Sequence, residues 1–165
     1  MNGTEKTVLK RIDSIVVKFM DFVVIVTSVA ITLMICATVV LRYGFGTDLY
    51  AIDEIETLLA FWLYFIGAAY ASYSKRQITA DIIAQFVKNK KIVKYITIIG
   101  CVIGCIVCLI FTKFSIDLLT FSIERSQKSL LWRIPMSYMY VSIVIGFVLM
   151  SVYCFRDMLE TINNE

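Results

Sequence analysis

The chain contains no histidine, one proline and seven glycines among its 165 residues. Without histidine, bis-histidine haem, histidine metal sites and histidine general-base catalysis are excluded. So few helix-breaking residues favour long, nearly uninterrupted helices. Walker, GxSxG and HExxH motifs are also lacking, so nothing indicates nucleotide hydrolysis, serine-hydrolase or zinc-protease chemistry. We expect a protein that is not an enzyme and needs no cofactor or metal.

Apolar residues make up 59% of the chain and define its class. A helix rises about 1.5 Å per residue, so 18 to 22 apolar residues are just enough to cross a hydrocarbon core about 30 Å thick. Four uncharged stretches meet this requirement: residues 22–41, 57–74, 95–112 (with a further extension to 123) and 134–155. The sequence therefore predicts an all-α integral membrane protein, with residues 1–165 forming a single domain of four transmembrane helices.

The distribution of basic residues predicts the orientation of these spans. Eleven basic residues lie in the two tails and in segment 75–94, against five in segments 42–56 and 113–133. The positive-inside rule therefore places both termini in the cytoplasm, although the four cations of segment 113–133 run against it. The net charge of +3 follows from this topology signal and needs no nucleic-acid partner.

Two further segments have amphipathic spacing. Apolar residues from Val8 to Phe19 recur on one helical face with basic residues mostly opposite, which predicts a helix over residues 1–21 on the cytoplasmic membrane surface. The alternative is that this segment simply extends the first span. A second surface helix is predicted from Ile78 to Val87. Both helices would contact membrane lipids, and anionic headgroups suit their basic residues.

Small residues mark the second and third spans as surfaces for helix packing. Gly67, Ala68 and Ala69 form one patch, and Gly100 and Gly104 form a GxxxG pattern. Membrane helices associate through such residues because small side chains let their backbones approach closely. We expect these positions to contact other helices, either within this chain or in a partner.

All five cysteines fall inside the predicted spans: Cys36, Cys101, Cys105, Cys108 and Cys154. This placement does not fit disulfides, which join extracellular loops. We interpret the cysteines as packing residues, because thiolates without basic neighbours would be poorly stabilised inside a membrane. A metal or redox cluster is the alternative.

Polar residues near the start of the second span are candidate contact residues. A carboxylate at the bilayer centre would cost about 2.5–3.5 kcal/mol, so Glu54 and Glu56 are expected at the outer interface. They are either contact residues or plain helix-start acids. Trp62 is either an interface-belt aromatic or a subunit-interface anchor. Arg42 either pairs with an acid of segment 42–56 or extends to the headgroups.

Residues 53–71 resemble the hallmark of the small membrane subunit (DctQ type) of tripartite ATP-independent periplasmic (TRAP) transporters. In that family an acidic residue is followed by a tryptophan eight positions later and then by Gly-Ala-Ala. Here these residues are Glu54, Trp62 and Gly67-Ala68-Ala69, and the preceding Arg42-Tyr43 is also similar.

Two downstream motifs extend the resemblance. The family's His-Ile-x-x-Asp is similar to Gln77-Ile78-Thr79-Ala80-Asp81, in which the histidine is replaced but Asp81 is kept to cap or orient the surface helix. Ile134-Pro135, followed by two tyrosines, resembles the family's entry into the fourth span. Proline is favourable in a first helical turn, where we expect Pro135.

The resemblance implies a non-catalytic accessory subunit in the bacterial inner membrane. Its partners would be a large multi-span membrane subunit, which carries the substrate and sodium sites, and a periplasmic substrate-binding protein. The substrate would be an organic acid anion such as a C4-dicarboxylate or a sialic acid, and this chain would brace the stationary scaffold. Two alternatives from the residues stay open: a four-helix membrane thiol or quinone redox protein, and a self-contained homo-oligomeric transporter.

Overall fold

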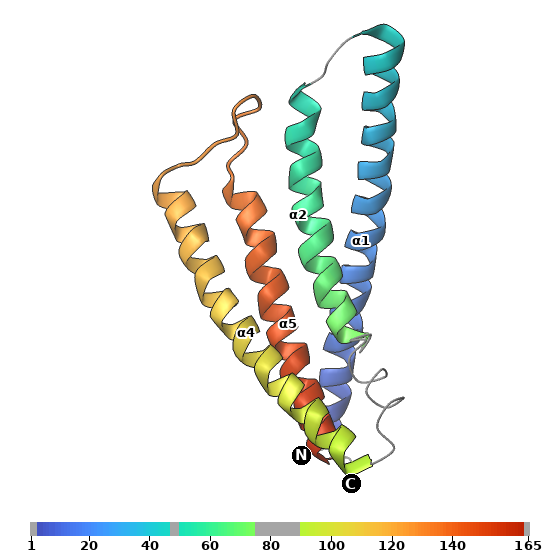
Figure 1. Ribbon diagram of the computed structural model, residues 1–165, viewed down its shortest axis with the longest axis vertical. Helices are drawn as coiled ribbons and strands as arrows, with labels where there is room; N and C mark the ends of the chain where they lie inside the picture. Colours follow the sequence, from blue (N-terminus) through green and yellow to red (C-terminus); the bar gives the residue numbers. More distant parts are fainter. Residues whose placement is uncertain (1–2, 47–49, 75–89, 164–165) are drawn as a thin grey trace.

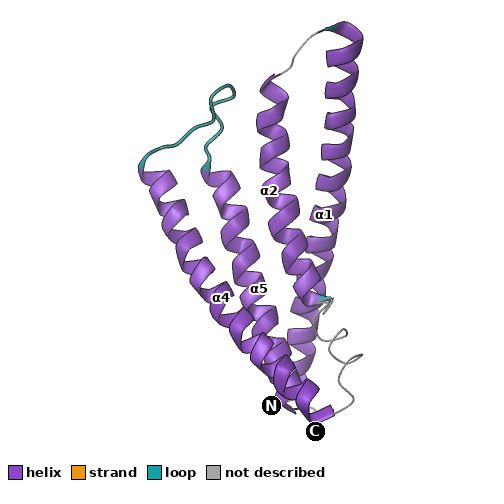
Figure 2. Cartoon of the chain, viewed as in Figure 1, coloured by secondary structure: helices purple, strands orange, loops and turns teal. Residues whose placement is uncertain are grey.

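The computed structural model describes residues 3–46, 50–74 and 90–163. These residues form four helices: α1 (Gly3–Phe45), α2 (Tyr50–Tyr73), α4 (Lys90–Glu124) and α5 (Ser137–Asn163) (Figure 1). Each contains a segment long and apolar enough to cross a membrane: Asp13–Gly44, Ile52–Tyr73, Ile98–Glu124 and Ser137–Leu159. Figure 2 shows helices joined by loops, without a strand in the described part of the chain. The predicted all-α fold with four membrane-crossing helices is confirmed.

The first helix, α1, is one unbroken helix of 43 residues, about 65 Å long. No glycine or proline lies between Gly3 and Gly44, so nothing interrupts the helix where the amphipathic segment meets the apolar span. The described part of segment 1–21 is therefore continuous with the first span, as the alternative of an extended span predicts. A position of this segment on the membrane surface stays a prediction. The second expected surface helix, from Ile78 to Val87, lies outside the described residues.

The helices α2 and α4 are also longer than the apolar stretches that predicted them. The helix α2 begins at Tyr50, seven residues before its apolar stretch, with Asp53 in its first turn. An acid there stabilises the positive end of the helix dipole, a contribution that hydropathy does not register. The helix α4 continues to Glu124, close to the longer of its two predicted ends.

The four helices form an open row and not a closed bundle. The backbone of α1 packs on α2, α2 packs on α5, and α5 packs on α4, with no other pair of the described helices in backbone contact. Figure 1 shows the helices converging toward the end that holds both termini and spreading toward the opposite end. We call the opposite end, where α1 ends, α2 begins and residues 125–136 join α4 to α5, the hairpin end. The row leaves large apolar side chains of α1 and α4 exposed to lipid or to other helices.

The core lies where α1, α2 and α5 converge. It is built around Met20, Ile66, Ala69 and Tyr153, each at most 4% exposed. Trp62 is partly buried and packs against the same cluster. Because lipid is as apolar as these side chains, close packing and not removal from water holds the helices together in a membrane.

Candidate functional site at the hairpin end

A hairpin over residues 125–136 joins α4 to α5. Its arms are held by an isolated bridge and two backbone hydrogen bonds: Lys128 to Pro135, Ser129 N–H to the Ile134 carbonyl (2.9 Å) and Met136 N–H to the Gln127 carbonyl (3.0 Å). Pro135 therefore belongs to the hairpin, which corrects the expectation that it lies in the first turn of the fourth helix. Helix α5 begins two residues later, at Ser137.

Glu54, near the start of α2, holds the tip of this hairpin. Its Oε1 accepts a hydrogen bond from the Leu131 N–H at 2.8 Å, and its Oε2 accepts one from the Trp132 N–H at 3.0 Å. Two N–H donors on the two oxygens match the acceptor-only chemistry of an ionised carboxylate. These residues lie 77 and 78 positions away in the sequence, so one side chain ties α2 to the α4–α5 connection.

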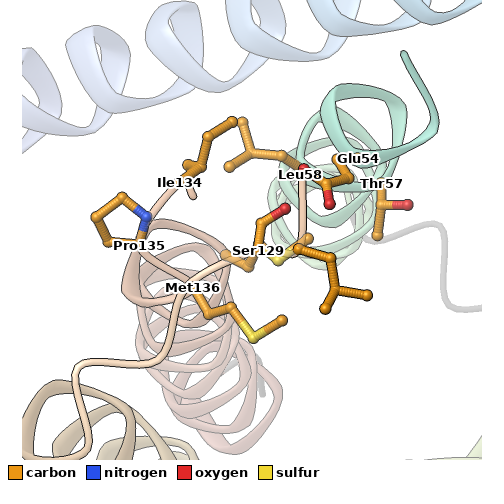
Figure 3. Close-up of a pocket in the computed structure, with 9 residues that line it drawn as sticks. Glu54, Thr57, Leu58, Ser129, Ile134, Pro135 and Met136 are labelled. Carbon is orange, nitrogen blue, oxygen red and sulfur yellow. The ribbon is translucent and has the colours of Figure 1, made fainter. Parts of the chain in front are cut away.

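A pocket of ≈180 Å³ lies beside this Glu54–hairpin contact (Figure 3). Its lining comes from α2, the hairpin and the first turn of α5: Glu54, Thr57, Leu58, Ser129, Leu130, Ile134, Pro135, Met136 and Met139. Glu54 is the one ionisable residue of this lining, so the pocket lacks the second titratable group that acid–base catalysis usually employs. The arrangement is suited to holding a loop in place.

Glu56 ties α2 to a different element. Its Oε1 accepts a hydrogen bond from the Thr38 hydroxyl of α1 at 3.5 Å. Residues two apart on a helix point in nearly opposite directions, which is why Glu54 reaches the hairpin while Glu56 reaches α1. Arg42 is exposed in the last turn of α1. Its positive charge there interacts favourably with the negative end of the helix dipole.

The predicted small-residue patch of α2 divides between the inside and the outside of the helix row. Ala69 is fully buried and Ala68 is exposed. A Cβ on Gly67 would come only within 4.0 Å of Val24, so this position would accept a methyl group. Asp81, the remaining candidate between α2 and α4, lies outside the described residues.

The two glycines of the GxxxG pattern in α4 also have different surroundings. A Cβ on Gly104 would lie 3.3 Å from the Sγ atom of Cys154 in α5, which makes Gly104 part of the α4–α5 contact. A Cβ on Gly100 would meet nothing within 4 Å. Within this chain, Gly104 therefore contributes to helix packing, whereas Gly100 faces no other side chain.

Cysteines gather where α4 packs on α5. Cys154 is buried, and its Sγ donates a weak hydrogen bond to the Cys101 carbonyl at 3.4 Å, while Cys105 and Cys108 follow on α4. All of these are free thiols. The described residues contain no group of three or more His, Cys, Asp or Glu residues placed to hold a metal ion.

Of the glycines in the described helices, Gly146 of α5 has the tightest surroundings, and no motif considered in the sequence included it. A Cβ there would lie 2.8 Å from both the Cβ and the carbonyl oxygen of Phe65 in α2. Ser142, four residues earlier, is also fully buried. The spacing of Ser142 and Gly146 is a small-xxx-small pattern, and this signal could have found the contact.

A charged cluster at the end that holds the termini was also missed. Arg156 of α5 lies 3.6 Å from Asp13 of α1 and 3.2 Å from Asp157. Its guanidinium donates to the Tyr73 carbonyl of α2 at 3.3 Å and lies 5.1 and 5.0 Å from the ring centres of Tyr73 and Tyr153. One side chain therefore links three helices. Its signal in the sequence is a solitary basic residue after the fourth span.

Replacing Glu54 with glutamine should loosen the hairpin. A glutamine amide offers one acceptor oxygen, so one of the Leu131 and Trp132 N–H groups would lose its partner and face a donor. We expect hydrogen exchange of the hairpin amides to become at least severalfold faster. Glu56→Gln is the matched control, because Glu56 contacts α1 and not the hairpin. Equal exchange rates in the two variants would contradict the role assigned to Glu54.

Comparison with known proteins agrees with the resemblance. Residues 31–164 match the family described as the DctQ component of tripartite ATP-independent periplasmic transporters. A relative from Haemophilus influenzae, named as a TRAP transporter small permease protein, is 23% identical over 133 residues, covering 79% of this chain and 80% of that protein. The family match covers the last third of α1, from Ile31 onward, and all of α2, α4 and α5. With four helices able to cross a membrane, the chain belongs to the DctQ family of small TRAP transporter subunits.

Proposed function

We propose that this chain braces the large membrane subunit of a sodium-coupled TRAP transporter for organic acid anions. The open row of helices carries the proposal, because it offers broad apolar faces and no enclosed route across the membrane between the described helices. The middle of the α1, α2 and α5 spans also lacks charged residues, as between Asp21 and Arg42 in α1, while Lys113 in the middle of the α4 span is exposed. Ion-coupled carriers place such residues at their binding sites, so substrate and sodium would bind to the large subunit.

The substrate class follows from the family and not from a residue of this chain. A periplasmic substrate-binding protein would deliver a C4-dicarboxylate or a sialic acid to the complex. Two faces of the helix row would have different neighbours, one the large subunit and the other membrane lipid. Exposed aliphatic side chains on α1 and α4, among them Leu33 and Ile103, suit either neighbour.

The proposed orientation has both termini in the cytoplasm and the hairpin end in the periplasm. Both termini lie at the same end of the molecule, as an even number of spans requires (Figure 1). The basic residues of the tails and of segment 75–94 support this orientation through the positive-inside rule. Single cysteines introduced at Ser126 and Thr4 of a chain without its own cysteines should react differently with a membrane-impermeant maleimide in intact cells. Labelling only at Ser126 supports the orientation, and labelling only at Thr4 would reverse it.

Purification from the native membrane tests the accessory role. Mild detergent extraction of the tagged chain should recover a much larger multi-span membrane protein in stoichiometric amount. Liposomes holding both subunits, with the binding protein and a sodium gradient, should take up the substrate. Liposomes holding this chain alone should show no flux. Recovery of the chain only as a stable homo-oligomer with flux of its own would instead favour a self-contained transporter.

Replacing all five cysteines with alanine tests the redox alternative. If the thiols act only as packing residues, the variant should keep substrate uptake within about twofold of the parent when assembled with its partners. Loss of packing at the buried Cys154 lowers stability by a modest amount, so uptake is normalised to the complex recovered. A thiol-dependent activity that disappears with the cysteines would favour the redox protein.

A further inference from the structure

A second pocket lies on the α4 side of the hairpin, away from Glu54. Its volume is ≈190 Å³, and its lining combines the end of α4, one hairpin arm and the start of α5. Five of its seven lining residues are polar: Ser122, Ser126, Gln127, Lys128 and Ser137, beside Ile123 and Pro135. The first pocket, in contrast, is mainly apolar, so the two sides of the hairpin differ in chemistry.

Ser122 is the buried polar residue of this second pocket. It is 1% exposed, and its hydroxyl has no hydrogen-bond partner among the described residues. The other two buried serines of the described helices donate to carbonyls of their own helix, Ser115 to Thr112 at 2.8 Å and Ser142 to Met139 at 2.7 Å. The buried hydroxyl of Ser129, in the first pocket, also has no partner among the described residues. Burying a hydroxyl without a hydrogen-bond partner costs free energy, so a polar ligand in the pocket would stabilise Ser122 by bonding to its hydroxyl.

The charges around the pocket favour an anion. Lys128 belongs to the lining, and the segment from Arg125 to Pro135 contains three cations and no acid. Ser137 begins α5, so the positive end of that helix dipole lies at the pocket. Glu54 is on the other side of the hairpin and engaged with backbone N–H groups.

The negative end of α4 is closed by its own backbone. The carbonyls of Phe121, Ser122 and Ile123 accept hydrogen bonds from three N–H groups of the following turn at 3.1 Å each. Glu124, in the last turn of α4, is exposed and is not part of the lining. These three carbonyls are therefore engaged, and the Glu124 carboxylate lies outside the lining.

These cations also run against the distribution of basic residues in the rest of the chain. Most basic residues lie in the tails and in segment 75–94, whereas Arg125, Lys128 and Arg133 lie at the opposite end. Topology does not explain their position, because the positive-inside rule disfavours it. A bound anion at this end of the molecule would explain it.

We propose that the pocket binds a phosphate-type oxyanion, supplied by a phospholipid headgroup or by free phosphate. Lys128 supplies the positive charge, while the hydroxyls of Ser122, Ser126 and Ser137 and the amide of Gln127 supply donors. Several donors around one small cavity suit a tetrahedral anion with four acceptor oxygens. The pocket lies where α4 ends its membrane-crossing segment, the level at which phospholipid headgroups lie.

Binding is measured on the full chain purified with its large subunit. In one arm, delipidated complex in detergent is titrated with inorganic phosphate, followed by phosphorus NMR line broadening, with chloride keeping the ionic strength constant. In the other arm, complex from native membranes is analysed by native mass spectrometry for retained phospholipid. The thermal stability of the complex is then compared between nanodiscs of phosphatidylglycerol and nanodiscs of a phosphate-free glycolipid.

The variants separate binding from folding. Lys128→Gln should weaken binding about tenfold because it removes the positive charge, and Ser122→Ala should weaken it severalfold because it removes a donor to a charged ligand. Ser115→Ala, a buried serine whose hydroxyl is satisfied, and Arg125→Gln, a hairpin cation outside the lining, are the matched controls and should change binding less than about twofold. In the absence of phosphate and phospholipid, Ser122→Ala should be as stable as the parent, since it removes an unsatisfied hydroxyl.

Binding of either free phosphate or a phospholipid supports the proposed site if Lys128→Gln weakens it most, Ser122→Ala weakens it less, and the two controls leave it nearly unchanged. Line broadening of inorganic phosphate identifies free phosphate as the ligand. Retained phospholipid that is lost in Lys128→Gln, without line broadening, identifies the lipid headgroup. No binding in either arm, or equal binding by Lys128→Gln and Arg125→Gln, would overturn the proposal.

Discussion

Replacing Gly146 with alanine is expected to destabilise the chain by about 1–3 kcal/mol, although the same change stabilises most helices. The added methyl group would lie 2.8 Å from the carbonyl oxygen and from the Cβ of Phe65. Neither atom is the end of a flexible side chain, so α2 and α5 must move apart. Separation of these helices would disturb the middle of the row, because α2 and α5 are its two central members. The fraction folded in a mixed-micelle denaturant titration measures the change.

Gly100→Ala is the matched control for Gly146→Ala. Both glycines lie within helices, but a Cβ on Gly100 meets nothing within 4 Å. We therefore expect this variant to gain about 0.5–1 kcal/mol, the usual effect of removing a glycine from a helix interior. The two variants should differ in sign, and equal effects would show that the close contact at Gly146 does not form. If Gly100→Leu folds normally but no longer recovers the large subunit, Gly100 faces that partner.

Replacing Arg156 with methionine is expected to cost about 1–2 kcal/mol and to separate the ends of three helices. The change keeps much of the apolar stem but removes the contacts to Asp13, Asp157 and the Tyr73 carbonyl. Arg156 and Asp13 are 29% and 39% exposed at their side chains, so solvent reduces the energy of this ion pair below that of a buried one. The same denaturant titration, with hydrogen exchange at the end of α2, measures both effects.

Arg156→Lys separates charge from shape. Lysine keeps the positive charge but loses the planar guanidinium that lies over Tyr73 and Tyr153, so we expect it to recover only part of the stability. Arg125→Gln is the control, because that guanidinium stacks on Phe121 at an exposed position and should change stability by less than about 0.5 kcal/mol. Full recovery by lysine would assign the cluster to charge alone.

The candidate residues show where sequence reasoning was sufficient and where it was not. Glu54 was singled out as an outer contact or a helix-start acid, but its partners lie 77 and 78 residues away, and no local pattern could indicate them. The GxxxG pattern drew attention to Gly100 and Gly104, whereas the glycine with the tightest surroundings in the described helices is Gly146. A small residue permits a close approach, but the crossing point of two helices decides which small residue is used.

The sequence by itself determined the class, the number of spans and the family. Apolar stretches of sufficient length and the scarcity of proline and glycine are local properties, and the motif around Glu54 and Trp62 is local as well. The tertiary structure decided that the helices form an open row in the order α1, α2, α5, α4. It also decided that Glu54 holds the hairpin and that Arg156 joins three helices. Those outcomes depend on contacts between residues far apart in the chain, which hydropathy and periodicity do not encode.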